Sequence, residues 1–359
     1  MRQRLNYTHP ANYFERDTSF IAAHHQPAIM LDLAMLRDVD SHLLLRGTQL
    51  FLDDMLTGNK LISPAQFLTL LSNSQKLLKG DDISFLFGQQ ILPGFNGPAS
   101  QVFNHALNLR QALIHLCEYH TLLLPICTPR YFESDTHFFI YWLDNCGAGA
   151  SQSKSQSSGL HTFLIEAHMT AVARMAAKMS QQNLPWRFNF THEEPRYVEQ
   201  YWVHLNEDIS FNQQLNMMSI PLEYANQTWS QTAQVSLQLA TLGSKMQLND
   251  LGWQASFLDT LHDYLMQNIQ QNLQLETVAT SFNVSSATLK RKLLKHHTHF
   301  QEQLDLARKH VALYLYQIKG YQHHDVADYL RFNDINNFRR AFKRWTGLPP
   351  GQLLQANCF

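Results

Sequence analysis

The chain has 359 residues, of which 45% are hydrophobic and 16% are charged, and its net charge is −1. This composition is typical of a globular protein with a sizeable core, and the length predicts two or three domains. No run of about 18 apolar residues occurs, so a membrane-spanning helix is not expected.

Charge is unevenly distributed along the chain. Residues 257–359 hold 12 Lys and Arg against 8 Asp and Glu, whereas the remaining residues hold 16 against 21. A basic C-terminal part that follows an acidic N-terminal part predicts nucleic acid as the partner of the C-terminal part only.

The N-terminus and the cysteines indicate a cytoplasmic protein. The first 17 residues are polar and include three arginines, which is unlike a secretory signal. The cysteines show no paired spacing, so we expect free thiols in a reducing compartment. They are Cys117, Cys127, Cys146 and Cys358.

Apolar residues recur at helical spacing in five segments before residue 120. Ser63 is a suitable N-cap for one of these helices and Pro64 a suitable first residue, while Gly88 is predicted to end another. The predicted helices cover residues 26–38, residues 42–56, the segment after Ser63-Pro64, residues 81–87 and residues 107–119.

The next segments are rich in aromatic and β-branched residues, which predicts strands. Residues 121–127 and 137–143 are expected to pair as a hairpin joined by residues 129–136. The aromatic residues of the second strand either pack on both faces of a sheet or line an effector cavity, and they are Phe138, Phe139, Tyr141 and Trp142.

The rest of the N-terminal part mixes helix and strand. The Gly- and Ser-rich residues 147–159 predict a mobile surface loop, and a long helix is expected at residues 160–182. Short strands are expected at residues 188–190 and 209–211, followed by a helix at residues 228–245. This part is therefore predicted to be an α+β domain with more helix than strand.

The C-terminal part contains two copies of one arrangement, at about residues 275–295 and 323–346. Each copy has a short helix, a tight turn and a longer basic helix, which is the helix-turn-helix pattern whose second helix enters the DNA major groove. In the second copy Asp334 is a suitable N-cap, and Gly347 is predicted to end the helix.

The first copy has its own turn and cap. Asn283 stands at a turn that often needs a left-handed backbone, which Asn tolerates. Either Ser285 or Ser286 caps the next helix. Residues 300–318 form an apolar-periodic helix that is predicted to hold the two motifs rigidly apart.

The C-terminal stretch resembles the DNA-binding domain of the AraC/XylS family of bacterial transcription regulators. The resemblance implies an all-α domain that binds promoter DNA through both motifs, and activation through contact with RNA polymerase. It is carried by Val278-Ala279, residues 285–293 (SSATLKRKL), Phe300-Gln301, residues 307–312 and above all residues 337–350 (NFRRAFKRWTGLPP).

Two sites depart from the pattern of this family. Arg331 stands in the second turn where the family usually has Gly, and a left-handed backbone there costs about 1 kcal/mol for Arg. The loop from His296 to Thr298 also lacks the usual Gly.

The N-terminal part resembles the effector domain of one branch of the same family, called arabinose-binding-like, over roughly residues 25–225. The resemblance implies a domain that binds a small-molecule effector or dimerises, without identifying the effector. It is carried by residues 62–67 (ISPAQF), residues 106–113 (ALNLRQAL), residues 190–192 (FTH), Pro195, Tyr197, Tyr201 and Phe211.

Seven family positions carried over to this chain, together with Ser286, Lys292 and Lys343 on the same helices, give ten expected DNA-binding residues. Arg291 and Arg340 have the chemistry for bidentate contact with guanine, and Asn336 for contact with adenine. The alternative for each basic residue is a phosphate contact or a solvated charge. The ten residues are Ser286, Ala287, Lys290, Arg291, Lys292, Ile335, Asn336, Arg339, Arg340 and Lys343.

Metal and catalytic sites are not expected. The chain has 19 histidines, but neighbours such as His24 and His25 point about 100° apart on a helix, and no HExxH or CxxC spacing occurs. There is no Gly-rich phosphate loop, nucleophile elbow or compact carboxylate pair, so the chain is not expected to be an enzyme.

Two other kinds of DNA-binding protein are alternatives to a regulator. A methyl-transferring repair protein needs an N-terminal cysteine cluster for zinc, and these four cysteines are too scattered. The other alternative is a ligand-independent architectural DNA-binding protein. Only an effector-dependent change in DNA affinity or transcription distinguishes it from a regulator.

The sequence therefore predicts a cytoplasmic transcriptional regulator with an α+β domain at residues 1–245, a linker at 246–256 and an all-α DNA-binding domain at 257–359. The expected partners are promoter DNA, RNA polymerase, an unknown small-molecule effector and a second copy in a homodimer. We expect an activator with no cofactor and no membrane association.

Overall fold

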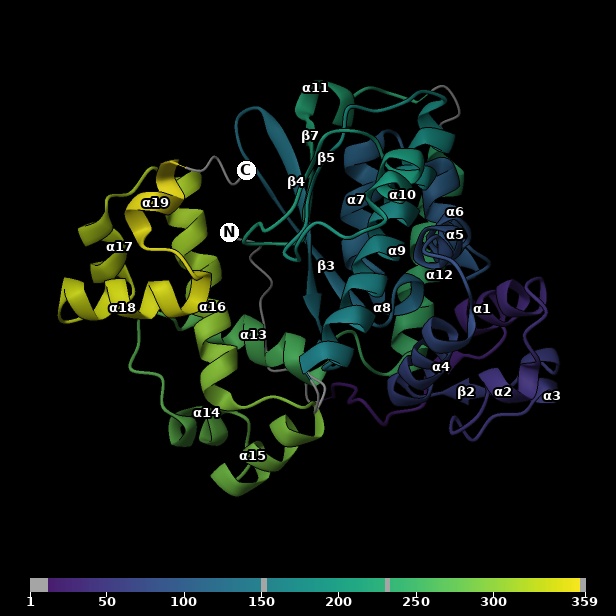
Figure 1. The fold of residues 1–359 in the computed structure, drawn as a ribbon, viewed down its shortest axis with the longest axis horizontal. Coiled ribbons are helices and arrows are strands. Elements are labelled where there is room, and N and C mark those ends of the chain that lie inside the picture. The colour runs from purple at the N-terminus through teal and green to yellow at the C-terminus, as the bar shows by residue number, and fades with distance from the viewer. Residues whose placement is uncertain (1–11, 150–153, 230–232, 356–359) are drawn as a thin grey trace. The chain divides into compact units, whose positions relative to one another are not determined.

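The computed structural model describes residues 12–149, 154–229 and 233–355 (Figure 1). These residues form two compact units, Asn12–Ser256 and the residues from Phe257 onward. The first unit mixes helices and strands, and the second is helical, as the sequence predicts.

The first unit has more helix than strand. Its elements in chain order are β1 (Ile21–Ala22), α1 (Gln26–Met35), α2 (Ser41–Leu44), α3 (Leu52–Leu56), β2 (Leu61–Ile62), α4 (Pro64–Leu77), α5 (Ile83–Ile91), α6 (Pro98–His105), α7 (Leu109–Glu118), α8 (His120–Leu123), β3 (Cys127–Glu133), β4 (His137–Asp144), α9 (Lys154–Ser180), β5 (Arg187–Asn189), α10 (Val198–His204), β6 (Ile209–Ser210), β7 (Met217–Pro221), α11 (Leu222–Ala225) and α12 (Gln234–Leu251).

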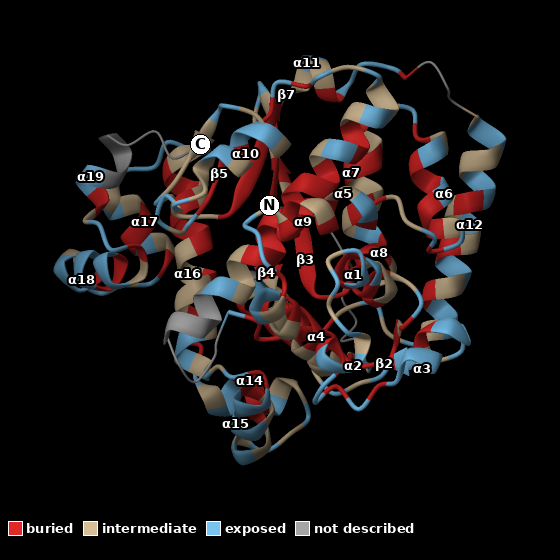
Figure 2. Ribbon diagram, turned by 45° about the vertical axis from the view of Figure 1, so that its right-hand side comes forward, coloured by how far each residue is buried: buried red, intermediate tan, exposed pale blue. Residues whose placement is uncertain are grey.

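A five-stranded sheet organises this unit, with the order β3-β4-β7-β5-β6. The β3–β4 hairpin pairs Cys127 with Asp144 and Glu133 with Phe138, and only β5 and β6 run parallel. Figure 1 shows α5, α7 and α9 gathered on one side of the sheet. Figure 2 shows that buried residues concentrate on the sheet and on α7 and α9, so the core lies between these two layers.

The hairpin is confirmed, but its first strand was predicted too early. Residues 120–123 form α8, and the strand β3 includes much of the expected loop at 129–136. Pro129 lies inside β3, which is unusual because Pro cannot donate to a ladder. The position is tolerated because β3 is an edge strand.

Gly88 lies inside α5 and does not end it, contrary to the prediction. A Cβ atom at Gly88 would lie 2.4 Å from the carbonyl oxygen of Ala167 on α9. Only glycine allows the two helices to approach this closely. Gly88 therefore has a packing role. In the sequence alone, a glycine with this role looks the same as a glycine that ends a helix.

Other helix boundaries also differ from the sequence prediction. The expected helix at residues 42–56 is split into α2 and α3, because Gly47 and Gln49 adopt left-handed backbones with φ of 78° and 60°. The expected loop 147–159 contains the start of α9, and its residues 150–153 lie outside the described residues.

The last helix of the first unit was placed several residues too early. α12 spans Gln234–Leu251, so six residues of the segment expected as a linker are helical. α6, α10 and β7 were not predicted. The cap at Ser63 was predicted correctly: its hydroxyl accepts from the Gln66 amide, and the Gln66 side chain accepts from the Ser63 amide.

The second unit contains only helices among its described residues. They are α13 (Phe257–Gln267), α14 (Leu275–Ser281), α15 (Ser286–Lys295), α16 (Phe300–Gln317), α17 (His323–Tyr329), α18 (Ile335–Thr346) and α19 (Pro350–Gln355).

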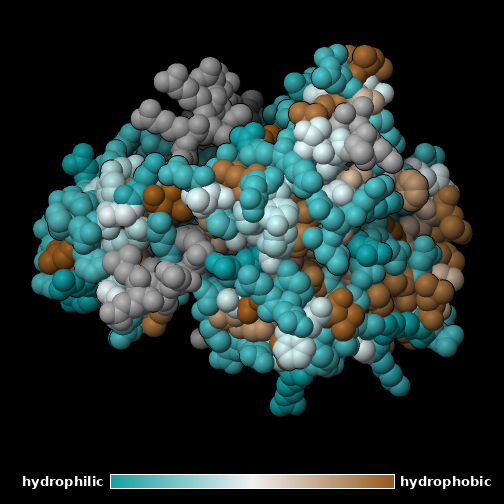
Figure 3. All heavy atoms as spheres, turned by 90° about the horizontal axis from the view of Figure 1, so that it is seen from above, coloured by the Kyte–Doolittle hydropathy of each residue, from teal (hydrophilic) through white to brown (hydrophobic). Residues whose placement is uncertain are grey.

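Within the part of the chain that the structure describes, no helix is both long and apolar enough to cross a membrane. Figure 3 shows that the surface in that view is mostly hydrophilic, with hydrophobic side chains in scattered groups. Exposed apolar residues of this kind are common on folded proteins.

Candidate nucleic-acid interface and ligand pocket

The two helix-turn-helix motifs have the same backbone hydrogen bonds in their turns. In the first motif, the Val284 amide donates to the Ala279 carbonyl at 3.0 Å. In the second, the Phe332 amide donates to the Ala327 carbonyl at 2.9 Å. The turn that follows α14 and the turn that follows α17 are therefore equivalent, and corresponding residues in them are 48 positions apart in the chain.

The second turn is one residue longer than the first. Ser285 caps α15 by accepting from the Thr288 amide at 3.1 Å, whereas Asp334 caps α18 by accepting from two amides, at 3.1 and 3.3 Å. Beyond the caps, equivalent residues are 49 apart, so the buried pair Leu289 and Phe338 correspond. This offset explains why the repeat is weak in the sequence.

The helix α15 presents most of its expected DNA-binding residues to solvent. Ala287, Lys290 and Arg291 are exposed, and Ser286 is half-buried at the first position of the helix. Lys292 is also half-buried, and its Nζ lies 5.7 Å from the ring centroid of Phe257. The first four residues share a free face, while Lys292 lies nearer the core.

The helix α18 presents a more strongly basic face. Asn336, Arg339, Arg340 and Lys343 are exposed, while Ile335 is half-buried. Its opposite face packs inward, with Phe338, Ala341 and Phe342 buried. By the 49-residue offset, Arg339 and Arg340 correspond to Lys290 and Arg291, so each motif places two adjacent cations at the same site.

Two side chains on α18 are positioned by neighbouring polar groups. Arg340 Nη2 donates to Asn337 Oδ1 at 2.5 Å, which holds the guanidinium along the exposed face. Arg344 forms an ion pair at 2.8 Å with Asp305 on α16. Arg344 therefore contributes to holding the motif on α16.

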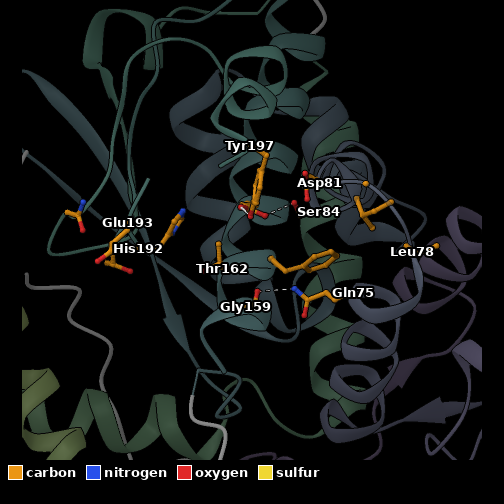
Figure 4. Close-up of a pocket in the computed structure, with 15 residues that line it drawn as sticks. Gln75, Leu78, Asp81, Ser84, Gly159, Thr162, His192, Glu193 and Tyr197 are labelled. Atoms are coloured by element: carbon orange, nitrogen blue, oxygen red, sulfur yellow. Dashed lines mark hydrogen bonds between the residues drawn. The ribbon is translucent and has the colours of Figure 1, made fainter. Parts of the chain in front are cut away.

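A cavity of about 730 Å³ lies within the first unit. It is lined by residues from α4, α5 and α9 and by the segment that follows β5. Figure 4 shows Asp81 and Ser84 on one side of the cavity and His192 and Glu193 on the other. The cavity has the size usual for a small-molecule site.

Glu166 is the buried acidic group of this cavity, with 2% of its surface exposed. Ser84 Oγ donates to Glu166 Oε2 at 2.5 Å, and the Tyr197 hydroxyl donates to Oε1 at 3.0 Å. The Tyr201 hydroxyl also donates to Oε1. His192 Nε2 lies 2.8 Å from the Tyr201 oxygen, which can then only accept.

Burial raises the pKa of Glu166, and the three hydroxyl donors oppose this change. Burial lowers the pKa of His192 to about 4, so this imidazole is neutral near pH 7. The hydrogen bonds from His192 through Tyr201 to Glu166 all point toward the carboxylate. The hydrogen-bond network therefore favours the ionised form of Glu166, whereas burial disfavours it.

The sequence prediction missed Glu166 as a site residue. The signal was present, because Glu166 is the one acidic residue within the apolar stretch FLIEAHMTAV of α9, and an acidic residue on a buried helix face needs partners. Phe138, Phe139, Tyr141 and Trp142 are buried in β4 and do not line this cavity.

Two family models match this chain. Residues 39–229 match the arabinose-binding domain of AraC transcription regulator, N-term, and residues 278–356 match a helix-turn-helix domain. The first match alone covers more than half of the chain.

Relatives of similar length also match. The ornithine utilization regulator of Pseudomonas aeruginosa is 23% identical over 360 residues, which cover 99% of this chain and 100% of the relative. The crystal structure of the transcriptional regulator CdpR from Pseudomonas aeruginosa is 17% identical with a TM-score of 0.39, and the match covers 92% of this chain and 98% of that one.

The N-terminal match is to a domain of a transcription regulator, and the first relative is named a regulator, in agreement with the expectation of a regulator rather than an enzyme. The helix-turn-helix match makes the C-terminal part a DNA-binding domain. With the N-terminal match over residues 39–229, the chain belongs to the AraC family of transcription regulators.

Proposed function

We propose that this DNA-binding regulator is a cytoplasmic activator whose promoter binding is controlled by a small molecule in the Glu166 cavity. The first unit, including all of α12 to Leu251, would bind the effector and form a homodimer, residues 252–256 would link it to the second unit, and residues 257–359 would bind DNA. The single observation that carries the proposal is a cavity built around a buried carboxylate inside the domain that matches an effector-binding family.

The DNA-binding surface is proposed to consist of the exposed faces of α15 and α18. Two reading helices on one chain enter successive major grooves, about 34 Å apart along one side of the duplex. Arg291 and Arg340 are proposed to contact guanine, and Asn336 adenine. Lys292 and Lys343 are proposed to contact phosphates, which supply affinity without sequence choice.

Activation is proposed from the family. A DNA-bound activator acts by contacting RNA polymerase, so the chain is expected to increase transcription from the promoter that it binds. The alternative is a ligand-independent architectural DNA-binding protein, which would bend or cover DNA without any response to a small molecule.

The name of one relative concerns the utilization of ornithine. Ornithine is therefore the first effector to test for this chain. Binding of the full chain to DNA upstream of its own gene would be measured with and without ornithine, together with transcription by purified RNA polymerase. An effector that changes DNA affinity and increases transcription supports the proposal, whereas DNA binding that no small molecule alters favours the architectural alternative.

A homodimer is supported by the exposed face of α12. Four apolar side chains follow one another at spacings of four, three and four residues, which is the spacing by which two helices pack. They are Val235, Leu239, Leu242 and Met246, with exposed fractions of 71%, 64%, 56% and 58%.

The opposite face of α12 buries Ala240, Ser244 and Leu248 against its own unit. The helix carries only one Lys and one Asp, so two copies can meet without repulsion between like charges. We therefore propose a second copy of this chain as the partner of the α12 stripe, defined by the four exposed apolar residues.

A further inference from the structure

We propose that the ligand of the Glu166 cavity carries a positively charged amine, and that Glu166 is the counter-ion of this amine. This inference rests on the proposed effector function of the cavity and adds the chemical class of the effector. It follows from the charge, burial and hydrogen bonds of the residues that line the cavity.

The charged groups of the cavity are all acidic. Among the described residues that line it, Asp81, Glu166 and Glu193 are carboxylates and none is Lys or Arg. His192 is the one histidine among these lining residues, and burial lowers its pKa to about 4. An anionic ligand would therefore meet three like charges and no cation.

Arg37, which lies close to the lining residue Gly80, is already paired. Arg37 donates to both carboxylate oxygens of Asp82, at 2.9 and 2.8 Å. Neither of these two residues lines the cavity. Arg37 is thus held by Asp82 and does not offset the charge of Glu166.

The hydrogen-bond partners of Glu166 favour its ionised form, in opposition to the effect of burial. Hydroxyl groups of Ser84, Tyr197 and Tyr201 donate to its two oxygens, and all three are donors. A carboxylate that accepts several hydrogen bonds is stabilised in its ionised form. A buried carboxylate without a nearby cation is nonetheless costly, and a bound ammonium group would remove that cost.

The rim of the cavity fits the rest of such a ligand. Asp81 and Glu193 are exposed, so they attract cations from solution and contribute less to the bound state. Thr162 and Asn212 add hydroxyl and amide groups to the lining. A small polar molecule with an amine at one end matches this distribution.

The affinity of an amine is then expected to depend on pH through Glu166. The titratable groups that face it are Tyr197, Tyr201 and Asp81, with His192 one hydrogen bond further away. Burial raises the pKa of Glu166 in the ligand-free protein. Below that pKa the carboxyl is neutral and must release a proton to bind a cation, so affinity falls about tenfold per pH unit.

The test measures direct binding to the full chain by calorimetry, with two pairs of matched probes. 4-Amino-1-butanol is compared with 1,4-butanediol, and 5-amino-1-pentanol with 1,5-pentanediol; within each pair a neutral hydroxyl group replaces the terminal ammonium group, and none of the probes carries a carboxylate. We expect at least one amine to bind, and at least about tenfold more tightly than its neutral partner. Equal affinities within both pairs, or no binding of either amine, would overturn the inference.

Two variants assign the effect to Glu166. Glu166→Gln keeps the size of the side chain and one acceptor oxygen, and it should abolish the preference for the amine. Glu199→Gln makes the same change at an exposed residue outside the cavity, and it should retain the preference. An unchanged preference in Glu166→Gln would overturn the role of Glu166.

A measurement on the unmodified chain covers the case in which Glu166→Gln does not fold. Amine binding should release protons below the raised pKa of Glu166, which calorimetry detects in buffers of different ionisation enthalpy. Binding without proton release and without pH dependence would contradict the inference.

The proposed effector function can fail independently. Amine binding that leaves DNA affinity unchanged would refute effector control and keep the amine site. A neutral effector that binds the cavity and changes DNA affinity would support effector control and refute the amine site.

Discussion

Asn283 and Arg331 occupy the same position in the two helix-turn-helix turns, and both have left-handed backbones, with φ of 54° and 59°. Asn tolerates this conformation because its short polar side chain can interact locally, whereas Arg gains nothing comparable. The second motif therefore stores strain in its turn that the first motif largely avoids.

Arg331→Gly is expected to stabilise the second unit relative to Arg331→Ala. Both variants lose the hydrogen bond from Arg331 Nε to the Gln270 carbonyl, so Arg331→Ala is a matched control. Only glycine relieves the left-handed strain, by about 1 kcal/mol in the free energy of unfolding. Urea denaturation measures the difference, and equal stabilities would contradict the strain at this turn.

Arg340→Ala is expected to weaken specific DNA binding by about 1 to 3 kcal/mol and to relax the choice of base at one position. The guanidinium lies on the exposed face of α18, held by Asn337. Affinities for a set of single-base operator variants provide the test. An equal loss of affinity for every sequence would instead make Arg340 a phosphate contact.

Arg344→Ala is the control for this measurement. Arg344 is paired with Asp305, so its loss is expected to change the choice of base at no position. A base preference that depends on Arg344 would show that the reading face of α18 is wrongly assigned.

Leu239→Lys is expected to convert a dimer of this chain into a monomer. Each copy loses the burial of one Leu side chain, worth about 1.5 to 3 kcal/mol, and places a charge in the interface. Sedimentation of the full chain measures its mass, with Gln234→Glu, on the same helix but outside the stripe, as control. A monomeric unmodified chain, or a dimer unaffected by Leu239→Lys, would contradict the role of the α12 stripe.

His168 is expected to make the first unit sensitive to acid. The side chain is buried on α9, its Nδ1 has no hydrogen-bond partner among the described residues, and burial lowers its pKa to about 3. Because this pKa lies below that of the unfolded chain, the stability is present above pH 6.5 and is lost as the pH falls, by about 1.4 kcal/mol per unit.

His168→Leu tests this dependence, because leucine fills a similar volume and does not titrate. Urea unfolding between about pH 7 and pH 5 should show a shallower loss of stability in the variant than in the unmodified chain. Identical slopes for the two proteins would assign the acid sensitivity to other groups.

The sequence predicted best where local patterns and burial agree. The cap at Asp334 and the left-handed Gly347 at the end of α18 were both predicted, because each depends on neighbouring residues alone. The sequence predicted poorly where contacts between distant parts of the chain determine the role of a residue. Gly88 looks like a helix end, and only the nearby Ala167 carbonyl reveals its packing role.

The DNA-binding surface and the cavity also differed in how far the sequence could predict them. The expected DNA-binding residues follow from the spacing within single helices, and most of them lie on exposed faces of α15 and α18. The cavity joins Ser84, Glu166 and Tyr197 from segments far apart in the chain. No periodicity in the sequence connects these residues.

The most direct measurement is a protection experiment with the full chain on DNA upstream of its own gene, over a series of salt concentrations and with random-sequence DNA as competitor. Two protected segments, one helical turn apart on the same side of the duplex, are expected for two reading helices. Affinity should fall as the salt concentration rises. Equal affinity for upstream and random DNA, with and without effector, would contradict a sequence-specific regulator.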